Sequence, residues 1–399
     1  MAYPNSRILQ ALQGLHLEQN NAPPLAPVFR RNASAPTPNP KPIPAPKLKA
    51  TRSAPPAAPP STVIDATDAP SHPKYSYQRA SPPPRMRFTR KEDEADAWVS
   101  ELDLKGPISV DCEWVVHFRR GPGGGQRPVS LIQIADKNNI ILIQIRTSQG
   151  AMARFPRALR RVLEDASIPK AGANILNDGK KLFRDYGILS QGLVELGGLA
   201  RQADPAFNGH GRKVVALAKA LSKDTSVRVS NWEHPDLHQN KEMLQYAADD
   251  AYSGFQLYSH LLSMAKANDI SLDQTKFTSA VDYPHLTGPT TISKPLAVVP
   301  VIVQTPDMDH AGVKLQYLRA YRYWALGKRS LDNMRSELRI DKQAGSLAPG
   351  TVITYIVETL TRWPKFMPDD LGELRLLLLE DIRSWERHSA WFLSKAGVV

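Results

Sequence analysis

Cysteine is almost absent from this chain of 399 residues, which contains only Cys112. A single cysteine excludes an intramolecular disulfide and a cysteine-rich zinc site, and it is typical of a reducing compartment. Long apolar runs are also lacking, since none approaches the roughly 20 residues that a membrane-spanning helix needs. We therefore expect a soluble intracellular protein with no membrane partner.

Acidic residues are scarce at the N-terminus, where residues 1–90 carry +9 of the net charge of +12. Residues 1–85 also hold 19 of the 34 prolines. Proline removes backbone donors and fixes φ, so we predict a disordered, partly polyproline II tail over 1–85. Its charge either raises nucleic-acid affinity non-specifically or is simply solvated. The proline density argues against a mitochondrial presequence, so the nucleus, alone or with the cytoplasm, is the expected location.

Acidic residues recur at three informative places further along. In VDCEW (110–114), Asp111 and Glu113 share one face of a predicted strand, and Cys112 faces the other side. Asp178 follows an apolar run at 170–175. In YAADDAY (246–252), the tyrosine at the start and Asp250 share a helix face, because they are four residues apart. Clustered carboxylates imply divalent cations, and ligands that are all oxygen favour Mg²⁺ or Mn²⁺ over zinc.

These motifs, in this order, resemble the 3′–5′ exonucleases of the DEDD superfamily, tyrosine-bearing subclass, and in particular the Werner-type exonuclease domain. The resemblance covers roughly residues 88–268. It rests on DCEW (111–114) with VSLIQI (129–134), on GANILND (172–178) with Lys181, and on YAADDAY with RVSNW (228–232). The histidine-bearing subclass has its histidine five residues before the final aspartate, where this chain has Gln245.

The resemblance implies a ribonuclease H-like fold and phosphodiester hydrolysis with two metal ions. Asp111 would bridge the ions, Glu113 and Asp250 would complete the ion that activates water, and Asp178 would hold the second ion. Tyr246 would orient the attacking water. The metal ligands expected are thus Asp111, Glu113, Asp178 and Asp250, and Tyr246 completes the catalytic set.

Substrate contacts are expected from cations on a glycine-rich loop, from a lysine after Asp178, and from a segment that the resemblance places near the site. These residues are Arg119, Arg120, Arg127, Lys181, Ser230 and Trp232. A solvated basic face explains the cations equally well. Two further acids are expected outside the site: Asp249 in solvent, and Asp185 paired with Arg184 or solvent.

The order of the elements predicts an α/β fold with a mixed sheet, followed by a smaller helical unit. Strands are expected at 108–114, 129–135, 140–145 and 170–175, and helices at 152–166, 178–186, 194–201, 214–222 and 238–266. The predicted organisation is a tail (1–85), an exonuclease domain (86–268), a proline-interrupted linker (269–305) and a unit that resembles a helix-turn-helix (306–399). Its helices are expected at 313–326, 330–338, 349–362 and 371–393. A fragment of about 86–270 should fold and cleave by itself.

The function expected is metal-dependent 3′–5′ exonuclease activity on nucleic-acid ends, with DNA slightly favoured over RNA. One alternative is an RNA-processing exonuclease of the ribonuclease D type. Another is a nucleic-acid-binding adaptor, in which the proline-rich tail and the C-terminal helices recruit protein partners and hydrolysis is incidental. The complete set of four acids and a tyrosine argues against the adaptor.

Overall fold

The computed structural model of the chain describes residues 75–117, 125–204, 227, 229–283, 286, 315–339 and 345–398. Five of the predictions therefore lie wholly or mostly outside the described residues: the tail, the linker, the helix at 214–222, Arg119 and Arg120. No helix within the described ranges is both long and apolar enough to cross a membrane.

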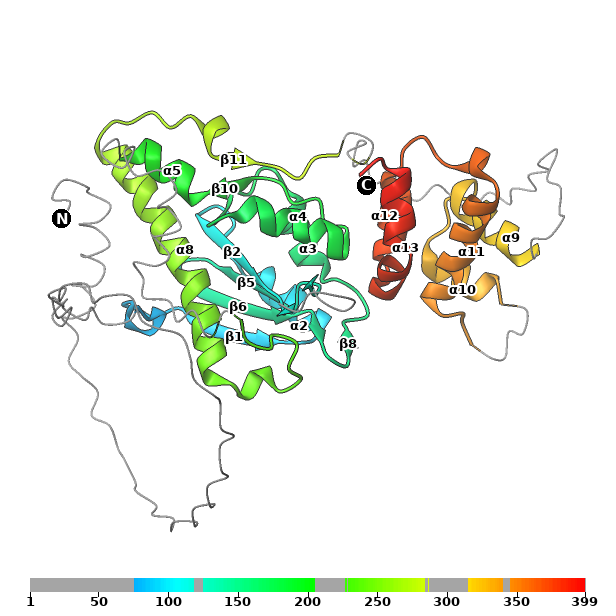
Figure 1. Ribbon diagram of the computed structural model, residues 1–399, viewed down its shortest axis with the longest axis horizontal. Helices are drawn as coiled ribbons and strands as arrows, with labels where there is room; N and C mark the ends of the chain where they lie inside the picture. The colour runs from blue at the N-terminus through cyan, green and yellow to red at the C-terminus, as the bar shows by residue number, and fades with distance from the viewer. Residues whose placement is uncertain are drawn as a thin grey trace, which may run out of the picture.

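A sheet of seven strands forms the centre of the molecule, in the order β1-β6-β5-β2-β9-β10-β11 (Figure 1). β2, β5 and β6 form an antiparallel meander. β9 runs parallel to β2, β10 runs parallel to β9, and β1 runs parallel to β6. The strands are β1 (Arg85–Thr89), β2 (Ile108–Glu113), β5 (Leu131–Ala135), β6 (Asn139–Gln144), β9 (Lys170–Gly172), β10 (Leu193–Glu195) and β11 (Thr278–Ser279). This mixed sheet confirms the predicted ribonuclease H-like fold class.

Helices cover both faces of the sheet because its central strands are apolar on both sides. In β5, Ile132 and Ile134 pack in one core cluster, whereas Leu131 and Ala135 pack in the other. The first cluster includes residues of α2 (Glu92–Val99), α3 (Arg157–Glu164) and α4 (Ile175–Tyr186). The second includes residues of α5 (Leu196–Ala203) and the long α8 (Lys241–Ala267). The alternation follows from the period of two along a strand.

The close approach of α8 to β2 positions the candidate site. Asn240 caps the helix by accepting a hydrogen bond from the Met243 N–H at 3.1 Å. On the face toward the sheet the Ser109 hydroxyl donates to the Ala251 carbonyl. Gly254 lies so near the same strand that a Cβ there would be 3.2 Å from the Cβ of Ser109. Small residues thus let α8 lie directly over β2.

The turn between β9 and α4 differs from the prediction of a strand over 170–175. β9 ends at Gly172, where a Cβ would lie 2.8 Å from the Val110 carbonyl oxygen. Asn174 then takes a left-handed conformation, with φ of 63°, and α4 begins at Ile175. Asp178 consequently lies in the first turn of a helix and not after a long strand.

The folded region that contains the sheet extends past both limits predicted for the exonuclease domain. Tyr75 and Tyr77 are buried in the cluster that contains α8, and Tyr77–Arg79 form the 3₁₀ turn η1. At the other end, β11 pairs with β10, so part of the predicted linker belongs to the sheet. Two short hairpins, β3 (Val116–His117) with β4 (Gly125–Gln126) and β7 (Arg146–Thr147) with β8 (Gly150–Ala151), extend from the meander. Among the described residues of this region, η3 (Leu237–Gln239) and η4 (Gln274–Lys276) are further 3₁₀ turns.

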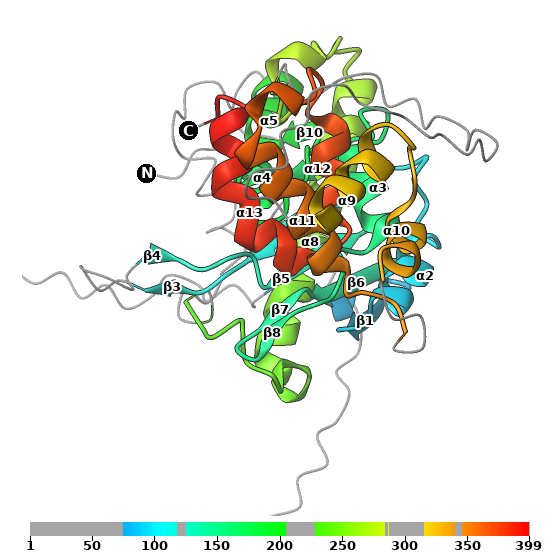
Figure 2. The ribbon, with the colours of Figure 1, turned by 90° about the vertical axis from the view of Figure 1, so that its right-hand side faces the viewer.

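The C-terminal residues form helices, as predicted, and α13 packs against α4. In Figure 2 these helices lie in front of α4. They are α9 (Leu315–Ala325), α10 (Leu331–Glu337), α11 (Pro349–Arg362), η6 (Pro364–Phe366), α12 (Gly372–Leu379) and α13 (Ile382–Lys395). The helix predicted over 371–393 is two helices, because Asp381 caps α13 by accepting from the Ser384 N–H. The resemblance to a helix-turn-helix stays a prediction.

Candidate metal centre and active site

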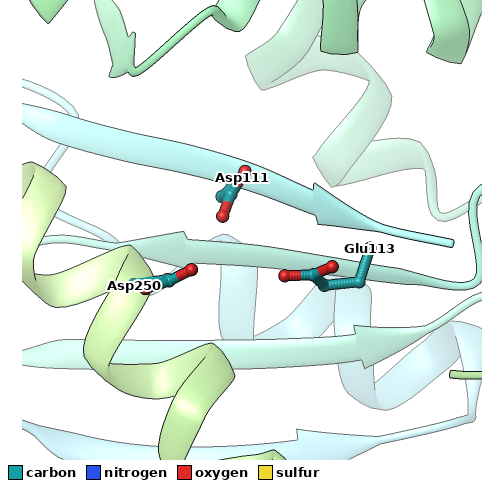
Figure 3. Close-up of side chains that lie close together, drawn as sticks. All are labelled: Asp111, Glu113 and Asp250. Atoms are coloured by element: carbon teal, nitrogen blue, oxygen red, sulfur yellow. The ribbon is translucent and has the colours of Figure 1, made fainter. Parts of the chain in front are cut away.

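Three carboxylates from two distant segments meet between β2 and α8 (Figure 3). One oxygen each of Asp111, Glu113 and Asp250 lies within 4.8 Å of the others. Glu113 and Asp250 are only 7% and 9% exposed, whereas Asp111 is half-buried. The strand period places the first two side chains on the face that α8 covers, and the close packing of α8 supplies the third.

The chemistry of this group fits a divalent cation. Carboxylates at this separation repel each other in a poorly solvated site, and a cation removes that repulsion. Oxygens within 4.8 Å of one another need only small side-chain shifts to reach one ion, because bonds to Mg²⁺ are about 2.0–2.1 Å long. The group contains no sulfur or imidazole ligand, which disfavours zinc.

Asp178 is also buried, at 7% exposure, but it is not part of this three-carboxylate group. The negative charge of Asp178 acts on Cys112. As predicted, Cys112 lies on the face of β2 opposite to Asp111 and Glu113. Burial raises the pKa of the Cys112 thiol well above its usual value, and the charges of Asp178, Asp111 and Glu113 add to the effect. The thiol is therefore unreactive. The role of Asp178 as ligand to a second ion stays a prediction.

Tyr246 lies one helical turn before Asp250 on α8 and is half-buried. Its ring packs against Trp232, with centroids 6.0 Å apart and planes tilted by 43°. Trp232 itself is fully buried, and its carbonyl accepts a hydrogen bond from Gln144 Nε2 at 3.1 Å. Its side chain presents no surface to a substrate, so the predicted substrate contact is wrong. Trp232 instead supports the tyrosine.

Lys181 is likewise internal, with 3% exposure. Its Nζ donates to the Arg127 carbonyl and to the Asp185 carboxylate, both at 2.8 Å, and lies 5.0 Å from the centre of the Trp114 ring. The expectation of a substrate contact is therefore wrong, because the ammonium is already used inside the fold. Asp185 is half-buried, and it accepts from Lys181 Nζ and the Val129 N–H, and not from Arg184.

Arg127 reaches the surface but is held by a residue that sequence reasoning missed. Its Nη2 and Nε lie 2.9 and 3.1 Å from the carboxylate of Glu233, which is buried. The same carboxylate lies 3.5 Å from Arg146 Nε. No local pattern relates these positions, so no signal in the sequence could have paired them. The predicted phosphate contact by Arg127, whose side chain is 42% exposed, stays a prediction.

Ser230 is half-buried on the same segment as Glu233.

Asp249 is not the solvated residue that the sequence suggested. It accepts hydrogen bonds from the Tyr77 N–H at 2.7 Å and from Gln245 Nε2 at 3.0 Å. Burial raises its pKa to about 6 despite these hydrogen bonds. Asp249 thus ties the η1 turn to α8, one residue before the acid of the candidate site.

Comparisons with known proteins identify the family of the region that holds this site. A family model described as "3′-5′ exonuclease" matches residues 86–266, which include all five predicted catalytic residues. A protein of Arabidopsis thaliana named "3'-5' exonuclease" is 30% identical over 227 residues, covering 52% of this chain and 76% of that protein. The chain belongs to the 3′–5′ exonuclease family.

Another curated relative matches this exonuclease over a much smaller share of its length. The mouse "Bifunctional 3'-5' exonuclease/ATP-dependent helicase WRN" is 34% identical over 158 residues, which cover 39% of this chain and 11% of that protein. Among solved structures, Escherichia coli RNase D is 16% identical, covers 79% of this chain and 76% of its own, and gives a TM-score of 0.36. The order and directions of the strands in the sheet, and not this low TM-score, show the ribonuclease H-like fold.

Proposed function

We propose that this exonuclease removes nucleotides from the 3′ ends of DNA or RNA with two Mg²⁺ or Mn²⁺ ions. The observation that carries the proposal is the meeting of Asp111, Glu113 and Asp250 within 4.8 Å. Asp178 in the first turn of α4 is proposed as the main ligand of the second ion. When bound, the ions supply charge relief on the phosphoryl oxygens and lower the pKa of the attacking water.

The residues of the chain position the reactants around these ions. Glu113 and Asp250 are buried, so their charges act in a medium of low dielectric and hold cations strongly. The Tyr246 hydroxyl orients the attacking water by a hydrogen bond, and Trp232 restrains the tyrosine ring from behind. In-line attack then releases a nucleoside 5′-monophosphate from the 3′ end.

We assign the chain to the tyrosine-bearing subclass. Tyr246 precedes Asp250 by one turn of α8. The position that carries histidine in the other subclass is Gln245, whose amide donates to Ser76 and Asp249. Those contacts direct Gln245 toward η1 and away from Asp111, Glu113 and Asp250. Action in the nucleus and recruitment of protein partners are further proposals, which rest on the sequence alone.

The test is cleavage of single-stranded DNA and RNA labelled at the 5′ end, with Mg²⁺, Mn²⁺ or EDTA. We expect a ladder that shortens from the 3′ end with either metal and no cleavage in EDTA. Asp250→Asn should reduce the rate by on the order of 10³-fold or more, because it removes a ligand charge and leaves the shape. The matched control is Asp332→Asn, which changes an exposed acid on α10. Cleavage that persists in EDTA, or an active Asp250→Asn variant, would contradict the proposal.

A further inference from the structure

Gln133 carries a buried side-chain amide at the centre of the sheet. The residue is fully buried in β5. Neither its Nε2 nor its Oε1 has a hydrogen-bond partner among the residues that the structure describes. Nearly all buried polar side chains in folded proteins are paired, so one that is not calls for a ligand, an ion or a bound water nearby.

The position of Gln133 points to the candidate metal centre. The register of β2 and β5 places it directly opposite Asp111. Its neighbours two residues away, Leu131 and Ala135, pack in the cluster that contains α8, so the amide lies on the face that carries the carboxylates. Residues opposite one another in an antiparallel pair have Cβ atoms about 4.5–5.5 Å apart. The amide is thus within reach of the Asp111 carboxylate.

Gln144 on the next strand shows what a glutamine with a structural role looks like here. Its amide nitrogen donates to the carbonyls of Trp232 and His234, at 3.1 and 3.0 Å. These contacts explain its burial, because they hold a segment of backbone. Gln133 has no comparable contact within the described ranges. An apolar side chain of the same size could fill this position without burying an amide that lacks a hydrogen bond.

An amide is suited to a group of carboxylates. It offers two N–H donors and carries no charge, so it can restrain a carboxylate without competing with a cation. Partners of this kind orient the side chains that bind metal ions and strengthen metal binding. We propose that Gln133 is a positioning residue of the metal-loaded centre, donating to the Asp111 carboxylate directly or through one ordered water. This inference rests on the proposed function, because it requires Asp111 to be a metal ligand.

The test is Gln133→Met in the full chain, which keeps the length of the side chain and removes the amide. Without metal, the melting temperature should rise by several degrees, because a bare buried amide is lost. The affinity for Mn²⁺, measured by calorimetric titration, should fall about tenfold. The kcat of the exonuclease should fall with it, and KM for the nucleic acid should stay within twofold. Gln133→Asn keeps an amide, but its side chain is shorter by one methylene, so the amide lies farther from Asp111. This variant should weaken Mn²⁺ binding as well.

Gln144→Met is the control, since it breaks two hydrogen bonds and should lower the melting temperature while leaving the Mn²⁺ affinity unchanged. If both Gln133 variants bind Mn²⁺ as tightly as the wild type, Gln133 is a packing residue and the inference is overturned. If the wild type itself neither binds Mn²⁺ nor shortens nucleic acid, the proposed function fails. A wild type that does both, beside an unaffected Gln133→Met variant, removes only the role of Gln133.

Discussion

Burial changes the acid–base chemistry of Lys170, a residue distant in function from the candidate site. It is fully buried in β9, and its Nζ donates to the Asp165 carbonyl at 2.6 Å. Burial lowers its pKa to about 7, although the charge of Asp165 acts in the opposite direction. In the unfolded chain the same amine titrates near 10.5. Between about pH 7 and 10.5 the folded state binds fewer protons, so stability rises with pH across that window.

Lys170→Met removes this titration and should change how stability depends on pH. Below pH 7 the folded wild type carries a buried ammonium, and the variant does not. The free energy of unfolding of the variant should therefore exceed that of the wild type by the largest amount below pH 7. That advantage should shrink by roughly 3 kcal/mol between about pH 6.5 and pH 9.5. Urea unfolding of both proteins at the two pH values measures it. Parallel changes in the two proteins would show that Lys170 keeps an ordinary pKa.

At the scale of elements, the segment 229–234 positions part of α8. Gln144 holds the carbonyls of Trp232 and His234, and the Ser148 N–H donates to the Glu233 carbonyl at 2.8 Å. The Glu233 carboxylate lies between the guanidinium groups of Arg127 and Arg146. These contacts keep the Trp232 ring against the proposed catalytic tyrosine.

Glu233→Gln should loosen this segment, because two guanidinium groups would then face each other without the carboxylate between them. We expect kcat to fall about five- to tenfold through misplacement of Tyr246, with the affinity for Mn²⁺ unchanged. In a Tyr246→Phe background the same substitution should cause little further loss, since both changes act on one group. Glu380→Gln, which breaks an exposed ion pair with Arg157, is the control. Equal fractional losses in both backgrounds would show that Glu233 acts elsewhere.

At the scale of the whole molecule, the C-terminal helices and the exonuclease sheet share one apolar cluster. Trp385 of α13 is 1% exposed, and its Nε1 donates to the Arg184 carbonyl at 3.3 Å. Arg375 of α12 donates to Glu164 and to the Gly187 carbonyl, at 2.6 and 2.8 Å. A Cβ on Gly187 would lie 2.8 Å from Leu379. The two units therefore stabilise each other.

A chain shortened to residues 75–286 tests how far the exonuclease depends on the C-terminal helices. It keeps η1 and β11, which the fragment 86–270 would lose. We expect it to bind Mn²⁺ and to cleave, because all five predicted catalytic residues lie inside it. Its melting temperature should fall by several degrees, because surface beneath Trp385 becomes exposed.

In the full chain, Trp385→Ala should lower the free energy of unfolding by about 3–5 kcal/mol.

Two outcomes with the shortened chain would contradict these expectations. A shortened chain as stable as the full one would show that the docked helices add no stability. A folded, monodisperse shortened chain that binds no Mn²⁺ would show that the C-terminal helices complete the site.

The sequence by itself determined the fold class and the face on which most of the candidate ligands lie. Asp111 and Glu113 share a face because side chains alternate along a strand, and Tyr246 and Asp250 share one because a helix repeats every 3.6 residues. Both rules are local, so a single strand or helix is enough to apply them. The convergence of the two pairs followed only from the family resemblance.

Only the tertiary structure decided which polar groups are already used inside the fold. Lys181 contacts a carbonyl 54 residues away, Arg127 contacts a carboxylate 106 residues away, and Asp249 binds an N–H 172 residues away. From the sequence, Lys181 was expected to contact substrate and Asp249 to face solvent, and no pattern indicated the carboxylate partner of Arg127. No periodicity relates such distant positions, because their contacts depend on how helices and strands pack. The partners of a polar side chain therefore follow from packing and not from its neighbours in the chain.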